Sequence, residues 1–271
     1  MFFAGATDTL LKKQAMSNHS QGQFMVVAGF VWSSVFIISA LFQGQYLPSG
    51  ETIKWALTIG VLSALANYML IYSMRKLEAG VASTIYRLNL AIAAIIAFIF
   101  LAETINFLKI SGLVLACIAV FCFAQHQRKI VTKGVWPMLL LVLIASFLRA
   151  VYGISYKIAL GDGVQYLWFL SGPGLGWVIL GTLTSFRSNG VKIPGEIIFR
   201  GAASGVLLSG LVFFFAKALK FGQASVIIPV SQMSFVVTAL LAWLFLGEKF
   251  SARKILGMGL ACISILFLSQ S

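Results

Sequence analysis

Residues 97–123 read AFIFLAETINFLKISGLVLACIAVFCF, and residues 242–268 read AWLFLGEKFSARKILGMGLACISILFL. Aligned without a gap at an offset of 145 residues, the two stretches share eleven identities over 27 positions. An internal repeat of this kind indicates an architecture built from two copies of one unit. Because both copies are apolar, they predict a two-fold symmetric membrane protein with its working site between the halves.

The composition places the whole chain in a membrane. Of its 271 residues, 60% are hydrophobic and only 10% are charged, whereas soluble proteins carry roughly 25% charged residues. Apolar runs of transmembrane length recur along the chain. We therefore expect an integral membrane protein, in the bacterial inner (plasma) membrane.

The net charge of +13 comes from 20 Lys and Arg against 7 acids. In a soluble protein this excess would suggest nucleic acid. Here it is explained by basic loops that orient helices, so no nucleic-acid partner is expected. Thirteen of these side chains lie in the loops after the odd-numbered predicted helices, and five lie on the opposite side of the membrane. Loops rich in Lys and Arg face the cytoplasm, which predicts that both termini are outside.

Cysteine and histidine give no sign of a metal or cofactor site. Cys117, Cys122 and Cys262 lie in apolar segments without a CxxC or Cys/His pattern. His19 and His126 lie far apart in loops. We expect no metal and no cofactor.

The apolar runs predict an all-α integral membrane protein with ten transmembrane helices, arranged as two inverted five-helix repeats. Residues 1–127 form the first repeat and residues 128–271 the second, together making one transmembrane domain. The repeats are inverted because a unit with an odd number of spans crosses the membrane the opposite way in its second copy. The expected helices are 1–16, 24–47, 53–75, 80–101, 107–125, 135–160, 165–187, 195–219, 222–246 and 252–269.

The repeat extends beyond the opening pair. Residues 77–83 resemble residues 219–225 at an offset of 142, which sets Arg87 near Pro229. The first expected helix is short. At ~1.5 Å per residue it spans ~24 Å, against a ~30 Å hydrocarbon core. Local membrane thinning and a longer N-terminus are both left open.

With these motifs, the chain resembles the drug/metabolite transporter superfamily, in its ten-helix EamA-like branch. The resemblance rests on Leu101-Ala102-Glu103 and Leu246-Gly247-Glu248, each followed by a glycine-led helix, at Gly112 and Gly257. It implies a secondary transporter that moves a small metabolite by alternating access through a cavity between the halves. It also implies that helices 1, 3, 4, 6, 8 and 9 line that cavity.

Ionisable residues within membrane helices are costly and mark functional sites. Arg149, Tyr152 and Tyr156 share one helix face, and a guanidinium beside two phenols suits a carboxylate held by a bidentate fork. Alternatively, Arg149 pairs with Asp8 and only joins two helices.

Three further polar residues in helices are substrate-binding candidates. Arg87 carries a second intramembrane charge and is flanked by Asn89, which offers a donor and an acceptor. Asp8 is a candidate proton carrier, since burial favours its neutral form and a nearby arginine its charged form. The simpler interpretation of Asp8 is an ion pair with Lys12 one turn away.

The remaining candidates are Asn67, Tyr68 and Tyr72 in the third expected helix and Gln232 near Pro229 in the ninth. Proline leaves a backbone carbonyl without its helical donor. Tyrosine is also common as an interface anchor. We interpret Glu103 and Glu248 as structural residues that orient the turn into the next helix.

The leading hypothesis is a secondary transporter for a small organic solute, anionic or zwitterionic, such as an amino acid. Proton or ion coupling is left open, as is the choice between monomer and homodimer. A lipid-moving or accessory membrane subunit is the alternative. An intramembrane enzyme is disfavoured because the seven acids do not cluster.

Overall fold

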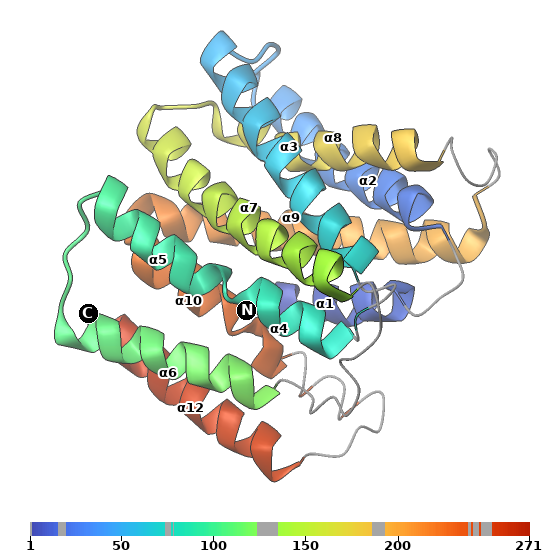
Figure 1. Cartoon of the computed structure of the whole chain (residues 1–271). Helices are drawn as coiled ribbons and strands as arrows, with labels where there is room; N and C mark the ends of the chain where they lie inside the picture. The colour runs from blue at the N-terminus through green and yellow to red at the C-terminus, as the bar shows by residue number, and fades with distance from the viewer. Residues whose placement is uncertain are drawn as a thin grey trace. The chain divides into compact units, whose positions relative to one another are not determined.

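The computed structural model describes residues 2–15, 20–73, 77, 79–123, 135–185, 193–237, 240, 244 and 251–271. All regular elements in these ranges are helices (Figure 1). They are α1 (Phe2–Ala15), α2 (Gln21–Phe42), α3 (Gly50–Ser73), α4 (Ala79–Arg87), α5 (Asn89–Phe100), α6 (Phe107–Phe123), α7 (Val135–Gly161), α8 (Tyr166–Ser185), α9 (Gly195–Phe221), α10 (Ala224–Gln232) and α12 (Ala252–Ser269).

Five of the described helices are long and apolar enough to cross a bilayer, namely α2, α3, α7, α8 and α9. The other apolar helices are shorter, including Phe107–Cys122 and Ile255–Ser269. The expectation of an all-α membrane fold is confirmed at this level. Ten crossings in two inverted repeats stay a prediction.

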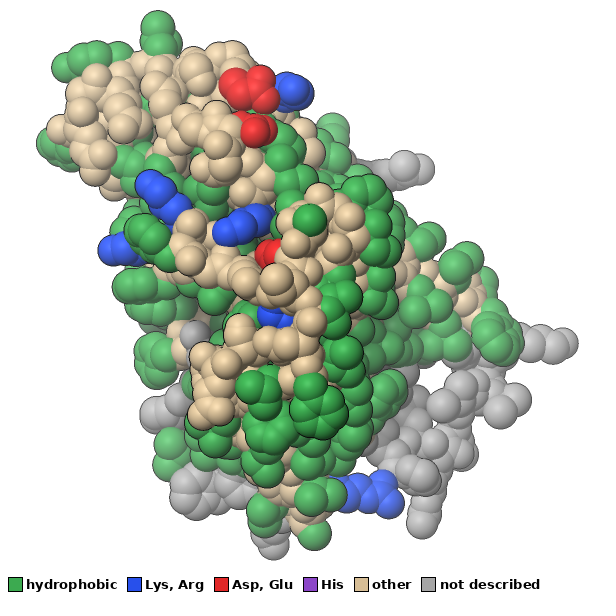
Figure 2. Space-filling view, turned by 90° about the vertical axis from the view of Figure 1, so that its left-hand side faces the viewer, with side chains coloured by type: hydrophobic (Ala, Val, Ile, Leu, Met, Phe, Trp, Pro, Cys, Tyr) green, Lys and Arg blue, Asp and Glu red, His purple; other side chains and the backbone are tan. Residues whose placement is uncertain are grey.

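Large apolar side chains cover much of the exposed surface, as the face in Figure 2 shows. Phe42, Leu47 and Trp136 are each more than 80% exposed. A soluble surface rarely carries large contiguous apolar patches, but in a bilayer these side chains contact lipid. The bilayer core also lacks water that could bond to the backbone, so the helices satisfy their own backbone hydrogen bonds.

Two helices that the sequence predicted as continuous are divided by a single turn. The expected helix 80–101 is interrupted at Leu88, and the expected helix 222–246 is interrupted at Met233. Leu88 N donates to Ile85 O and Met233 N donates to Val230 O, each at 3.1 Å. These i→i+3 bonds tighten the chain into a 3₁₀ turn, so the prediction of unbroken helices was wrong at both places.

The elements of the two halves keep a constant register of 145 residues. The pairs of helix starts are Gln21 and Tyr166, Gly50 and Gly195, Ala79 and Ala224, and Phe107 and Ala252. The breaks at Leu88 and Met233 differ by the same number. The offset of 142 used for residues 77–83 was therefore wrong, and Arg87 corresponds to Gln232 rather than to Pro229.

The chain folds into two compact units that do not follow the sequence halves. The first contains residues 1–5, 66–154 and 221–271, and the second contains residues 6–65 and 155–220. Each unit therefore draws helices from both halves. The division into domains at residues 127 and 128 stays a prediction.

The first unit is centred on a core of α5, α6 and α12. Leu90, Ala119, Met233 and Ala261 are almost fully buried in it. Helices α6 and α12 lie side by side (Figure 1), where Ser264 Oγ donates to Gly112 O at 2.7 Å. The break residue Met233 is thus held inside the core.

The second unit is organised around α2 and α8. A Cβ at Gly29 would lie 2.8 Å from Trp177 Cβ and would meet the backbone of Gly174, so only glycine permits this close approach. Beside it, the rings of Trp32 and Trp177 pack edge-to-face at 6.0 Å.

Candidate functional site

The break between α4 and α5 is capped by two side chains. Asn89 Nδ2 donates to Tyr86 O at 2.7 Å, and Ser146 Oγ on α7 donates to the same carbonyl at 3.2 Å. Asn89 is fully buried. A carbonyl that loses its helical donor in an apolar medium needs such partners, so Asn89 and Ser146 stabilise the interruption.

The break after α10 is capped by a charge from the other half of the chain. Arg87 Nη1 donates to Gln232 O at 2.7 Å and to Ser234 Oγ at 3.4 Å. The guanidinium carbon also lies 5.4 Å from the ring centre of Phe235. The positive group is therefore placed at the partially negative C-terminal end of α10.

Helix α7 brings a second arginine to this region. Arg149 follows Ser146 by three residues and so lies one turn further along the same helix face. Its guanidinium carbon is 4.7 Å from the ring centre of the buried Tyr152. A Cβ on Gly153 would lie 2.9 Å from Ile228 Cδ1, so α7 also packs closely on α10.

These contacts define what we call the break cluster, which lies within the first unit. Its members are Tyr86, Arg87, Asn89, Ser146, Gln232 and Ser234. Three predicted site residues, Arg87, Asn89 and Gln232, meet in it, and α7 carries Arg149 beside it.

Other predicted site residues lie apart from the described contacts of the break cluster. On α3, Tyr68 and Tyr72 stack with ring centres 6.1 Å apart, and Asn67 is half-buried one residue earlier. Tyr156 is fully buried in the second unit, where its ring meets Phe169 at 4.9 Å. The side chain of Asp8 lies outside the described residues. Substrate contact by these residues stays a prediction.

Sequence reasoning missed Ser146 and Ser234. Serine is common in membrane helices, so neither position looks unusual alone. Two signals in the sequence could have found them. Ser146 lies three residues before Arg149 and so on the same helix face, and a register of 145 residues pairs Ser234 with Asn89.

A separate polar cluster joins α10 to the loop before α6. The carboxylate of Glu103 accepts hydrogen bonds from Ala224 N at 2.6 Å and Ser225 N at 2.9 Å. The amine of the buried Lys109 donates to Thr104 O and to Gln223 Oε1. Glu103 is thus a helix cap, although it orients α10 rather than the helix that follows it.

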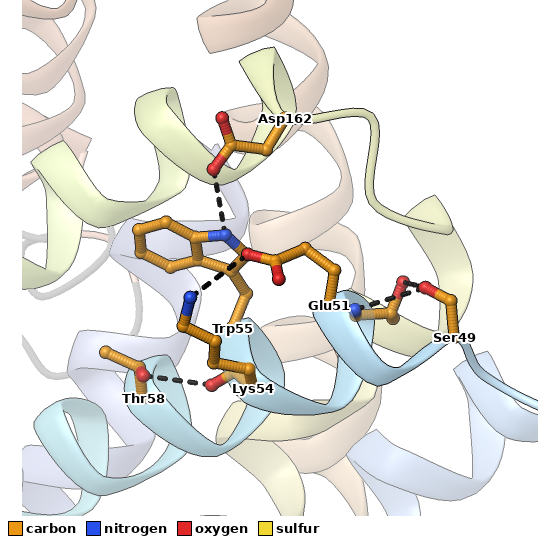
Figure 3. A network of polar contacts seen from close by, with 7 residues as sticks. Ser49, Glu51, Lys54, Trp55, Thr58 and Asp162 are labelled. Atoms are coloured by element: carbon orange, nitrogen blue, oxygen red, sulfur yellow. Dashed lines mark hydrogen bonds and ion pairs between the residues drawn. The ribbon is translucent and has the colours of Figure 1, made fainter.

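The second unit carries an exposed polar network where α2 leads into α3 (Figure 3). Trp55 Nε1 donates to Asp162 Oδ2 at 3.0 Å, and Lys54 pairs with Glu51 at 3.4 Å. Gln165 Oε1 accepts from Ser49 N at 2.8 Å. These contacts tie the loop after α2 to the loop after α7.

The apolar helices, the exposed apolar side chains and the polar cluster at paired helix breaks define a class of protein. It is that of helical integral membrane proteins with an internal polar site. The chain belongs to the EamA-like transporter family, whose model matches residues 1–125 and again residues 136–270. The resemblance to the drug/metabolite transporter superfamily is therefore confirmed. The protein is a membrane transporter for a small-molecule substrate.

Two relatives carry the name of a transporter, and one solved structure shares the fold. The chain is 23% identical over 274 residues to the S-adenosylmethionine/S-adenosylhomocysteine transporter of Chlamydia trachomatis serovar L2, covering 95% of this chain and 83% of the relative. It is 32% identical over 78 residues to an uncharacterized transporter of Sinorhizobium sp, covering 29% of this chain and 55% of that protein. A crystal structure at 14% identity superposes with a TM-score of 0.83, covering 99% of this chain and 94% of the other, and shows the fold alone.

Proposed function

We propose that this protein is a secondary transporter that moves a small anionic or zwitterionic metabolite across the bacterial inner membrane by alternating access. The observation that carries the proposal is the hydrogen bond from Ser146 to Tyr86 O. It joins the helix that bears Arg149 to the break beside Arg87, so two guanidinium groups belong to one polar region.

Two arginines within apolar helices favour an anionic group on the substrate. A charge in the membrane is costly unless it is paired or faces a water-filled path. Guanidinium groups match carboxylates through two parallel hydrogen bonds. A substrate carboxylate between the helices would therefore bind where water does not compete.

The repeat supports the transport mechanism. The family model matches each half separately, and the helix starts keep one register of 145 residues. Two five-helix units in tandem are inverted in the membrane, and rocking of such units alternates access to a site between them. The break cluster takes residues from both halves of the sequence, since Arg87 contacts Gln232 and Tyr86 contacts Ser146.

The printed name of the relative from Chlamydia supports a substrate with an amino-acid group. S-adenosylmethionine and S-adenosylhomocysteine both carry an α-amino-acid group with a carboxylate and an ammonium. A solute with such a group suits the arginines of the break region. The proposal leaves open proton or ion coupling, for which Asp8 is the candidate carrier, and the choice between monomer and homodimer.

The proposal is tested by counterflow in vesicles. Vesicles that hold the purified protein are loaded with unlabelled S-adenosylmethionine, or with one of the twenty amino acids, and the labelled form is added outside. We expect saturable accumulation of at least one probe by the natural protein. Arg149→Ala should abolish it, while Arg149→Lys should retain part of it.

The control is Arg200→Ala. Arg200 pairs with Glu196 one turn away at 2.7 Å on α9, so its loss should leave counterflow within about twofold because such pairs contribute little. Absence of counterflow for every probe, or unchanged counterflow in Arg149→Ala, would overturn the proposal.

A further inference from the structure

The amide of Asn89 has one atom that the described contacts do not satisfy. The side chain is fully buried, and its Nδ2 donates to Tyr86 O at 2.7 Å. A carbonyl accepts only from a donor, so this bond fixes which end of the amide is nitrogen. Within the described part of the chain, Oδ1 has no hydrogen-bond partner.

A buried acceptor without a donor is unfavourable and uncommon. Leaving such a group unsatisfied costs about 1–3 kcal/mol, and each case in a native protein calls for an explanation. Leu90 beside it is fully buried in the core of the first unit. An arrangement of this kind is explained if a ligand supplies the donor.

The charges around Asn89 indicate which ligand group that is. Arg87 precedes Asn89 by two residues, and α7, which carries Arg149, is bonded through Ser146 to the carbonyl that Asn89 caps. The arginines attract the anionic end of a substrate. Asn89 Oδ1, in the same region and two residues from Arg87 in the sequence, is a neutral acceptor that suits a cationic or polar N–H donor on the same molecule.

We propose that Asn89 Oδ1 accepts a hydrogen bond from the α-ammonium group of the substrate while an arginine of the break region holds its carboxylate. The inference rests on the proposed transport function and names its substrate class, a solute with an α-amino-acid group. Asn89 is then a specificity-determining residue that separates amino acids from simple carboxylates.

The alternative is that Asn89 only caps Tyr86 O. Ser146 offers a matched control, because Ser146 Oγ donates to the same carbonyl and carries no part of the ammonium contact. A capping role predicts the same consequences for the loss of either side chain. A recognition role predicts that only the Asn89 substitution changes selectivity.

The experiment measures ligand selectivity of the full-length protein in detergent. The ligands are L-methionine, L-phenylalanine, L-leucine and L-glutamate, each paired with the carboxylate that lacks the α-amino group. Affinities come from the rise of the unfolding midpoint with ligand concentration. The natural protein should bind at least one amino acid about 10-fold to 100-fold more tightly than its partner, as expected for one hydrogen bond with a charged group.

In Asn89→Leu, whose side chain has the same number and branching of heavy atoms, this ratio should fall to within about threefold, whereas Ser146→Ala should keep it. Equal ratios in the natural protein and in Asn89→Leu, or an equal collapse in Ser146→Ala, would overturn the inference. The inference can be tested even if Asn89→Leu does not fold. Equal affinity of the natural protein for both members of every ligand pair would also overturn the inference.

The two proposals fail in different ways. Binding of carboxylates and amino acids with equal affinity leaves the transport proposal standing and removes only the role of Asn89. Absence of binding by every ligand, together with absence of counterflow, removes both.

Discussion

The breaks at Leu88 and Met233 occupy the same place in the two copies of the repeat but are stabilised by different chemistry. At Leu88, the carbonyl at the break belongs to Tyr86, and the neutral side chains of Asn89 and Ser146 cap it. At Met233, the carbonyl belongs to Gln232 and is capped by the charged side chain of Arg87. The backbone geometry is repeated, whereas the polar side chains are not.

Under the proposed function, this difference assigns substrate specificity to the side chains that the two copies do not share. The repeat supplies two adjacent turns in the middle of helices, and turns of this kind are tolerated only where protein or cavity water satisfies them. One break is capped by a cation and the other by a neutral amide, so the region is unsymmetrical. Under the proposed function, such a region suits an unsymmetrical substrate with one anionic end.

The largest effect is expected when the charged cap is removed. Arg87→Ala leaves Gln232 O without the guanidinium and should lower the free energy of unfolding by about 2 kcal/mol, with loss of counterflow. Arg87→Lys keeps a charge and a donor but not the planar fork, so it should recover part of the stability. Chemical denaturation in detergent measures both variants.

Gln232→Ala is the control for this prediction. The substitution removes the side chain but leaves the carbonyl that Arg87 contacts, so a change within about 0.5 kcal/mol is expected. A loss as large as that of Arg87→Ala would mean that the side chains, and not the backbone of the break, hold the two copies together.

The sequence alone was sufficient for most of the fold. The expected spans 107–125 and 195–219 agree within a few residues with Phe107–Phe123 and Gly195–Phe221, because a bilayer requires continuous apolar helices. The breaks could not be predicted, since Leu88 and Met233 are ordinary apolar residues with no local preference for a turn. Pro229, which drew attention instead, lies four residues before Met233 within α10.

The site was predicted only in part for a related reason. Arg87 and Asn89 stand out because polar groups are costly in apolar helices. The residues that complete the cluster depend on which helices pack together. Tyr156 illustrates the limit, because its spacing from Arg149 suggested a shared face while its ring packs against Phe169 and Phe215.

A smaller effect is expected at the N-terminal cap of α10, and it tests whether the two copies are capped in the same way. Glu103→Ala removes the acceptor for Ala224 N and Ser225 N and should lower stability by about 1–2 kcal/mol. Glu103→Gln keeps one acceptor without the charge and should lose about half as much. The same substitutions at Glu248, which lies outside the described residues, show by chemical denaturation whether the second copy depends equally on its glutamate.

The control for this cap is Glu51→Ala. Glu51 forms an exposed pair with Lys54, so its removal should change stability by less than about 0.5 kcal/mol. If Glu51→Ala were as destabilising as Glu103→Ala, the loss would reflect removal of any carboxylate and not the capping of α10.

The smallest effect has the opposite sign and concerns the residue before Glu103. Ala102 has a φ of 49°, just after the C-cap of α5 at Leu101, where helices commonly end with glycine. The second copy has Gly247 at the corresponding position. Because a left-handed conformation costs about 1–2 kcal/mol for a residue with a Cβ, Ala102→Gly should raise stability by about 0.5–1 kcal/mol after the entropy of glycine is allowed for.

Thermal unfolding measures the gain, and Ala102→Val should show a loss, since a β-branched residue is the least tolerant of positive φ. A decrease in Ala102→Gly would mean that the first copy ends α5 in a different way from the glycine-containing second copy.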